Sequence, residues 1–174
     1  MKIWIITDTH LGHAKMVELC GRPADHSERI LSNLAAMPDD GVLIHLGDIC
    51  IGNDDKWNSA LLDALPTKFK AVLVRGNHDK KSDAWYYQRG WDFVCEMLSN
   101  TYFGKQILFS HAPLEKAGSH DINIHGHFHN SEHRLDEATR RWYDPSYHRK
   151  LALEETDYRP ILLETFLKLP GQPQ

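Results

Sequence analysis

The stretch KIWIITDTH, residues 2–10, decides the fold class of this chain. Lys2–Thr7 is a short apolar run rich in isoleucine, which predicts a buried strand. Val42–Leu46 and Ala71–Val74 show the same near-continuous apolar pattern. Such runs are typical of strands that are covered on both faces and are often parallel. Polar residues follow each run at once, beginning with Asp8-Thr9-His10 after the first.

Two helical patterns separate these three runs. In Ser27–Met37 the apolar residues Ile30, Leu31 and Leu34 share one face, with Asp25 or Ser27 available as the N-cap. Lys56–Leu65 carries Trp57, Leu61, Leu62 and Leu65 at helical spacing. The alternation of strand and helix predicts an α/β layer architecture.

The second half of the chain is richer in strand-like segments, which predicts a second sheet packed on the first. The expected strands are Asp92–Met97, Tyr102–Phe103, Gln106–Ser110, Ile122–His125, Leu151–Glu154 and Ile161–Phe166. Gly104-Lys105 could turn a hairpin between two of them. Residues 130–148 are polar and predict a long surface excursion. We expect one domain over residues 1–170 and a flexible end at 171–174.

Composition sets limits on the class of protein. A chain of 174 residues with 41% apolar and 25% charged residues is ordinary for a globular domain. No apolar run approaches the ~18 residues of a membrane span, and the N-terminal run is too short for a secretory signal, so a cytoplasmic location is expected. The formal charge of −4, without a basic block, gives no support to non-specific nucleic-acid binding. Three cysteines without CxxC spacing indicate buried thiols rather than disulfides.

Histidine is the unusual component, with 12 residues, and it is the commonest metal ligand. Metal-ligand types follow five apolar strands at once. They are Asp8-Thr9-His10, Gly47-Asp48, Gly76-Asn77-His78-Asp79, His111 and His125-Gly126-His127-Phe128-His129. Because ligands bind outside the carboxyl ends of strands in open α/β sheets, we expect one shared crevice. Carboxylate, amide and imidazole without thiolate suit Mn, Fe, Zn, Co or Ni rather than Ca.

As an ordered set, these motifs resemble the calcineurin-like metallophosphoesterases. DTHLGH at 8–13, Arg22-Pro23 and Tyr158-Arg159-Pro160 further resemble a small bacterial and phage branch of that family. The chain departs from the family's frequent GDxxD pattern, because Ile51-Gly52 stand around the place of the second Asp. Asp48 itself is retained, so the departure concerns local support rather than the metals.

The resemblance implies a four-layer α/β/β/α sandwich with two mixed sheets and two metal ions at the carboxyl ends of the strands. Metal one would take Asp8, His10, Asp48 and His129, and metal two would take Asp48, Asn77, His111 and His127. Asp48 would bridge them. The ions would be divalent transition metals, with Mn²⁺ preferred and Fe, Ni, Co or Zn as alternatives.

The resemblance also implies a reaction. A hydroxide that bridges the two ions would attack phosphorus, and His78 would serve the leaving oxygen. Asp79 is expected to orient His78. His13 and Arg22 are the candidates for substrate binding.

The sequence leaves the substrate open. A phosphodiesterase or phosphomonoesterase on a small phosphoester is favoured, because the chain has no added DNA-binding domain and is acidic. A nuclease and a non-catalytic metal scaffold are the alternatives; no membrane partner is expected, and the oligomeric state cannot be read. Outside the motifs, His45 is interpreted as a core histidine, His125 as a core residue or a support for the ligands, and Cys50 as a buried thiol.

Overall fold

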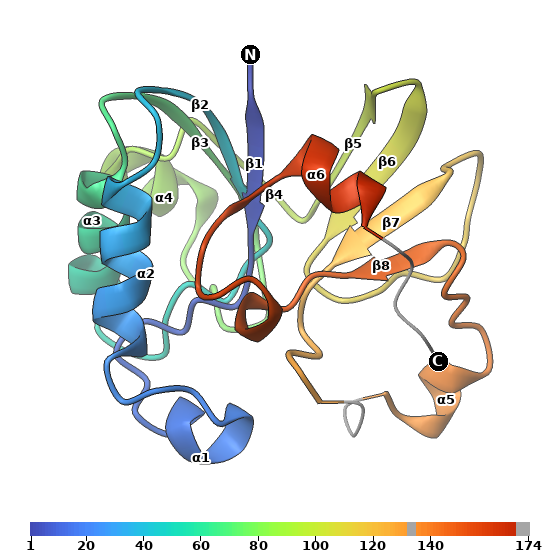
Figure 1. Cartoon of the computed structure of the whole chain (residues 1–174), viewed down its shortest axis with the longest axis horizontal. Helices are drawn as coiled ribbons and strands as arrows, with labels where there is room; N and C mark the ends of the chain where they lie inside the picture. The colour runs from blue at the N-terminus through green and yellow to red at the C-terminus, as the bar shows by residue number, and fades with distance from the viewer. Residues whose placement is uncertain (132–134, 170–174) are drawn as a thin grey trace.

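Two β-sheets lie face to face in this computed structural model, which describes residues 1–131 and 135–169 (Figure 1). The first sheet has the strand order β4-β3-β2-β1-β9. Its strands are β1 (Ile3–Ile6), β2 (Asp40–His45), β3 (Lys68–Val74), β4 (Phe93–Cys95) and β9 (Ile161–Leu162). β1 to β4 pair in parallel and β9 pairs antiparallel with β1. The predicted first three strands are confirmed.

The second sheet has the order β5-β6-β7-β8. Its strands are β5 (Met97–Tyr102), β6 (Lys105–Ser110), β7 (Ile122–His125) and β8 (His148–Lys150). β5 and β6 form an antiparallel hairpin, whereas β6, β7 and β8 run parallel. Both sheets are therefore mixed, as predicted.

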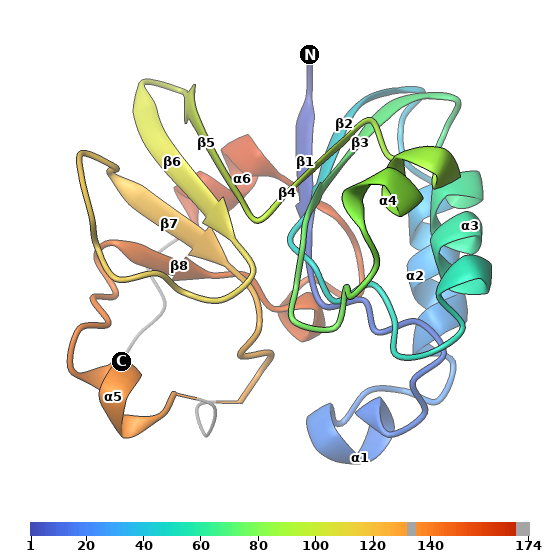
Figure 2. The same cartoon turned by 180° about the vertical axis from the view of Figure 1, so that it is seen from behind.

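Helices cover the outer face of the first sheet (Figures 1 and 2). They are α2 (His26–Ala35), α3 (Asp54–Ala64) and α4 (Asp83–Arg89). Ile30, Leu34 and Leu61 are fully buried in the core between these helices and the sheet. Since α2 and α3 begin and end within two residues of the predicted helices, the apolar spacing identified them correctly.

A second core fills the space between the two sheets. Ile5, Ile44 and Val74 reach it from the first sheet, and Phe109 and Ile124 reach it from the second. The short helix α6 (Leu163–Lys168) adds Leu163 and Phe166. These interdigitating layers fix the ends of β1, β2, β3, β6 and β7 relative to one another.

Three predicted strands differ from the structure. Asp92–Met97 is split at Glu96, because the chain leaves the first sheet after β4 and enters the second as β5. Leu151–Glu154 is a buried coil followed by the 3₁₀ helix Leu153–Glu155. Ile161–Phe166 is the two-residue strand β9 and then α6, whose buried residues Leu163 and Phe166 have helical spacing.

The predicted turns are nearly correct. The hairpin between β5 and β6 turns at Phe103-Gly104, one residue before the expected pair, so Tyr102 ends a strand and Phe103 lies in the turn. The excursion over 130–148 contains α5 (Glu137–Arg140), but Tyr147 and His148 at its end are buried rather than on the surface. Residues 132–134 of that segment and the expected flexible end at 171–174 lie outside the described residues.

The remaining helix is α1 (Met16–Cys20), which follows the first polar loop. Among the helices that the structure describes, none is long and apolar enough to cross a membrane.

Candidate metal centre

The polar segments after five strands meet where the carboxyl ends of the two sheets come together. Two groups of buried or half-buried side chains there could each hold a metal ion. The first group is Asp8, His10 and His129, and the second is Asp48, His111 and His127. Loops after β1, β2, β6 and β7 supply them, as the strand-end pattern predicted.

In the first group, one carboxylate oxygen faces two imidazoles. Asp8 Oδ1 lies 3.8 Å from His10 Nε2 and 3.6 Å from His129 Nε2. The rings of His10 and His129 are stacked, with centroids 5.1 Å apart. All three residues are at most 3% exposed, so bulk water cannot reach these oxygen and nitrogen atoms to hydrogen-bond with them.

In the second group, His111 is central. Its Nε2 lies 3.0 Å from Asn77 Oδ1, 3.0 Å from His127 Nδ1 and 3.4 Å from Asp48 Oδ2. Asn77 follows β3 and brings an amide oxygen to this group. The second group therefore combines carboxylate, amide and imidazole donors.

Asp48 connects the two groups. Its Oδ2 lies 3.4 Å from His111 Nε2 and 3.6 Å from His10 Nε2. Its other oxygen, Oδ1, accepts a hydrogen bond from the backbone N–H of His78 at 2.8 Å, which fixes the carboxylate plane. One oxygen of Asp48 therefore faces both groups at once.

These residues fit two metal ions on geometry as well as chemistry. Metal–ligand bonds of about 2.0–2.2 Å place neighbouring ligand atoms roughly 3–3.6 Å apart, which is close to the spacing in both groups. Among the described residues, Asp8 Oδ1 and His129 Nε2 are buried without a hydrogen-bond partner. Buried polar atoms without partners are costly, and a cation between them would satisfy both.

A backbone carbonyl orients the imidazole ring of His111. Its Nδ1 donates to the carbonyl of Leu46 at 2.8 Å, so Nε2 is the nitrogen that is left to bind an ion. Asp8 is held in the same way, since its Oδ2 accepts from Thr7 Oγ1 at 2.7 Å and from the His127 N–H at 2.8 Å. In each of these side chains, one polar atom is hydrogen-bonded within the protein and the other is left to bind an ion.

The backbone is strained where the ligands project. Asp8, His10, Asp48, His127 and His129 all have positive φ, between 43° and 68°. Non-glycine residues in this region each cost of order 1–3 kcal/mol and cluster at functional sites. Because the five residues share this conformation, their side chains leave the strand direction and turn towards one another.

Burial and charge shift the titration of the centre. Burial is the largest influence on the pKa of Asp48 and raises it, but His111 holds that pKa below the usual range. Burial would lower the pKa of His111, yet the carboxylates of Asp48 and Asp8 raise it to about 9. Burial lowers the pKa of His10 to about 3. Paired anionic and imidazole groups therefore already favour a cation at this position.

His78 is placed differently from the candidate ligands. Its side chain is 42% exposed, and its Nε2 lies 3.9 Å from Asp48 Oδ2. His13 is half-buried, and the centroids of the His13 and His78 rings lie 6.0 Å and 5.6 Å from that of His10. Both imidazoles thus border the centre on its accessible side.

Two predicted roles do not fit the structure. Asp79 was expected to orient His78, but its buried carboxylate accepts hydrogen bonds from the N–H groups of Gly76, Asp48 and Ile49. Backbone amides thus engage both oxygens of Asp79, which therefore supports the loops after β2 and β3. Burial raises its pKa to about 6.

Arg22 was expected to bind substrate, but its side chain is completely buried beneath the centre. The guanidinium donates to the carbonyls of Asp8 and Thr9 at 2.8 and 3.0 Å and pairs with Glu154 at 2.7 Å. Arg22 therefore has no surface that a substrate could contact.

The remaining interpretations hold. His45 is fully buried; its Nδ1 accepts from the Gly47 N–H at 3.0 Å and its Nε2 donates to Thr9 Oγ1 at 3.0 Å. His125 is also fully buried and bonds to the Gly126 carbonyl and the Tyr143 hydroxyl. Cys50 is a buried thiol whose pKa burial raises to about 12.

Sequence reasoning missed Glu154. This residue lies on the 3₁₀ helix Leu153–Glu155, and its Oε1 is 3.3 Å from His129 Nδ1. Nothing in its spacing marks it, because it lies 25 residues from His129 and outside the strand-end motifs. The motif Tyr158-Arg159-Pro160 just after it was the nearest signal.

This chain is similar to known proteins over nearly its whole length. A family model for the calcineurin-like phosphoesterases matches residues 1–171. An uncharacterized protein of Methanocaldococcus jannaschii, MJ1445, is 30% identical, and the match covers 97% of this chain and 90% of that protein.

Two solved structures share the fold. A protein of unknown function from Aquifex aeolicus, AQ665, superposes with a TM-score of 0.73 at 26% identity, covering 97% of this chain and 99% of that one. An archaeal phosphodiesterase superposes with a TM-score of 0.51 at 20% identity, covering 94% of this chain and all of that one.

Proposed function

Because this chain belongs to the calcineurin-like phosphoesterase family and is a hydrolase acting on phosphoesters, we propose that it acts through two divalent ions that both bind Asp48. The ligands would be Asp8, His10, Asp48 and His129 for one ion, and Asp48, Asn77, His111 and His127 for the other. The observation that carries the proposal is the position of Asp48 Oδ2, within 3.6 Å of an imidazole nitrogen from each group.

The ions and the side chains would have different roles in the reaction. When bound, two divalent ions supply the charge that neutralises phosphoryl oxygens and that lowers the pKa of water. His78 stands at the open side of the centre, where its imidazole can donate a proton to the departing oxygen. His13 lies beside it and can donate to a further substrate oxygen. The buried ligand set and its strained loops are preorganised, so little reorganisation is needed during the reaction.

Mn²⁺ is the ion that we propose. The donors are hard carboxylate and amide oxygens together with imidazole nitrogens, and this set contains no thiolate. Such mixed sites suit Mn²⁺, with Fe, Co, Ni and Zn as competitors that bind with different strength.

A small phosphoester is the substrate class that fits best, either a monoester or a diester. The ions that the candidate ligands would hold contact only the phosphoryl group, while His78, on the side of the leaving group, is exposed to solvent. Two of the basic residues that could serve a nuclease are engaged with other protein groups. Arg149 donates to the carbonyls of Phe166 and Leu169, and Lys150 pairs with Glu155 at 3.1 Å.

The test is a panel of phosphoesters assayed with each metal in turn. Metal-free protein would be loaded with Mn²⁺, Co²⁺, Ni²⁺, Zn²⁺ or Mg²⁺ and given nitrophenyl monoesters and diesters, nucleotides, and single- and double-stranded oligonucleotides. We expect hydrolysis of small esters with two ions per chain and the highest rate with Mn²⁺. Activity without metal, or with one ion per chain, would contradict the proposal. Preference for oligonucleotides over all small esters would favour the nuclease.

A further inference from the structure

Glu154, Arg22 and His129 form a buried network behind the first metal group. Glu154 Oε1 lies 2.8 Å from Arg22 Nε, 2.7 Å from Arg22 Nη2 and 3.3 Å from His129 Nδ1. The side chains of Arg22 and His129 are 0% exposed and that of Glu154 is 6% exposed. The network therefore acts in a water-poor environment, where hydrogen-bond directions matter most.

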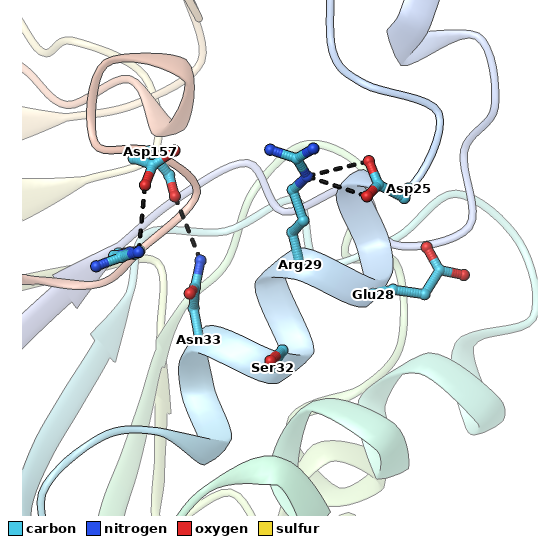
Figure 3. A pocket seen from close by; sticks show the side chains of 7 residues that line it. Asp25, Glu28, Arg29, Ser32, Asn33 and Asp157 are labelled. Carbon is cyan, nitrogen blue, oxygen red and sulfur yellow. Dashed lines mark hydrogen bonds and ion pairs between the residues drawn. The ribbon is translucent and has the colours of Figure 1, made fainter.

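The C-terminal segment that carries Glu154 is fastened to α2. Asn33 Nδ2 donates to the carbonyls of Asp157 and Tyr158 at 3.3 and 2.9 Å, beside the surface pocket between α2 and this turn (Figure 3). Two ion pairs lie in that pocket, since Arg29 bonds to Asp25 and Arg159 pairs with Asp157. The two hydrogen bonds from Asn33 thus anchor the turn after Glu154 to α2.

Cys20, His129 and Glu154 form a third group that could hold a metal ion by distance alone. A cation is already there, however. Arg22 Nη2 lies 2.7 Å from Glu154 Oε1 and 3.3 Å from His129 Nδ1. The guanidinium is permanently charged and balances the buried carboxylate, so this cluster is complete without an ion.

The donors and acceptors in the network determine which nitrogen of His129 carries the proton. Arginine has only donors, so the Nδ1–H of His129 can be accepted by Glu154 but not by Arg22. That arrangement leaves the lone pair on Nε2, which lies 3.6 Å from Asp8 Oδ1 in the first metal group. Without the carboxylate, Nδ1 would face the guanidinium alone and would accept from it, which places the proton on Nε2.

We propose that Glu154, held by Arg22, is a positioning residue that keeps the Nε2 lone pair of His129 directed at the first metal position. The inference rests on the proposed two-metal function. Arg22 contributes twice, because it orients Glu154 and also clamps the carbonyls of Asp8 and Thr9 in the loop after β1. Losing such a support for a ligand typically lowers metal affinity by about 10- to 100-fold.

The first measurement begins with the wild type. Long-range proton–nitrogen NMR of the imidazoles in the metal-free protein should show the proton of His129 on Nδ1. Glu154→Met, which preserves volume and removes the acceptor, should move that proton to Nε2. Glu154→Gln retains an acceptor oxygen and should keep it on Nδ1. A wild-type proton on Nε2 overturns the proposal, even if the methionine variant fails to fold.

The second measurement counts ions at a buffered free-metal concentration that just saturates the wild type. We expect two ions per chain in the wild type and one in Glu154→Met, because the affinity for the ion of the first metal group should fall by about 10- to 100-fold. Glu155→Ala is the matched control, because Glu155 is the exposed neighbour on the same 3₁₀ helix and pairs with Lys150. It should keep both ions.

The lost ion is identified by combination with Asn77→Ala, which removes a ligand of the second group. Asn77→Ala should hold one ion, and the double variant with Glu154→Met should hold none. A double variant that still binds one ion, or a Glu154→Met protein with both affinities unchanged, overturns the proposal. A wild type that binds fewer than two ions would instead contradict the proposed function.

Discussion

The carboxylate of Asp48 divides its oxygens between two tasks. Oδ1 is fixed by the N–H of His78 at 2.8 Å, while Oδ2 faces His10 in one metal group and His111 in the other. The side chain is almost fully buried, so the charge has no water to stabilise it. The two ions of the proposed centre, or protonated imidazoles in their absence, would balance it.

We therefore expect Asp48→Asn to lose affinity for both ions. The amide keeps the shape but removes the charge, and half of its polar end becomes a donor. Elemental analysis of dialysed protein should fall from two ions per chain towards zero, with hydrolysis reduced at least about 100-fold. Asp55→Asn, on exposed α3 beside Arg89, is the control and should keep both ions. Full occupancy and activity in Asp48→Asn would remove the bridge from the model of the centre.

His78 separates chemistry from metal binding. Because it is not among the candidate ligands, His78→Ala should keep both ions. Its rate of hydrolysis should fall by about 10²–10⁴ for esters with poor leaving groups, and by much less for nitrophenyl esters, which need little protonation. The difference is measured by comparing the loss of kcat in His78→Ala, relative to the wild type, for alkyl and nitrophenyl phosphate esters. An equal loss on both would assign His78 to phosphoryl binding instead.

At the residue scale, the sequence predicted which side chains gather but not all of their roles. Asp8, His10 and the histidines after β6 and β7 were recognisable because strand ends converge in this architecture. Arg22 and Asp79 were singled out but given other roles, and Glu154 was missed, since the contacts of all three depend on partners distant in the chain. The pair of Arg22 and Glu154 spans 132 residues, and no local pattern reports such a contact.

Among the loops, those after β2 and β3 approach so closely that glycine is required. A Cβ on Gly76 would lie 2.2 Å from Asp48 Oδ1 and 2.5 Å from Asp48 N. Asp79 then bonds to the amides of Gly76 and Asp48 and ties the two loops together. The metal position therefore depends on backbone contact between elements as well as on the ligands.

Gly76→Ala should push the Asp48 loop out of place. We expect a loss of about 1–3 kcal/mol in the free energy of unfolding from overpacking, together with weaker binding of both ions. Gly104→Ala is the control, because Gly104 has positive φ but nothing within 4 Å of an added Cβ. It should cost about 1 kcal/mol from backbone strain and leave metal binding unchanged. Chemical denaturation and metal titration of both variants distinguish the effects; equal metal affinities would contradict the close-approach argument.

The element predictions failed where an apolar run was too short to reveal its period. Ile161–Phe166 has apolar or β-forming residues at five of its six positions, interrupted by Glu164, and was interpreted as a strand. Burial of Leu163 and Phe166, three apart, is equally compatible with one helical turn, which is what packs between the sheets as α6. The longer patterns of α2 and α3 gave enough turns to decide, and those helices were predicted correctly.

For the whole molecule, the two-sheet core fixes the site while the surface charge limits the partners. The formal charge is −4. The arginines of 140–149 are occupied locally, since Arg140 bonds to the Leu135 carbonyl, Arg141 pairs with exposed Glu137, and Arg149 bonds to carbonyls near α6. These three arginines thus bind protein groups rather than lining a track for a phosphate backbone.

We therefore expect duplex DNA to bind weakly and with little dependence on salt. Each phosphate neutralised by Lys or Arg adds about −0.9 to the slope of log K against log salt on duplex DNA. Binding through one phosphoryl group at the metals should give a shallow slope, whereas a nuclease that grips four or more phosphates should exceed about −4. Duplex and single-stranded oligonucleotides would be titrated across a salt series with metal-loaded His78→Ala, which limits turnover. Submicromolar duplex binding with the steep slope would mean that the surface cations exchange their present partners for phosphates, and the nuclease would then become the better assignment.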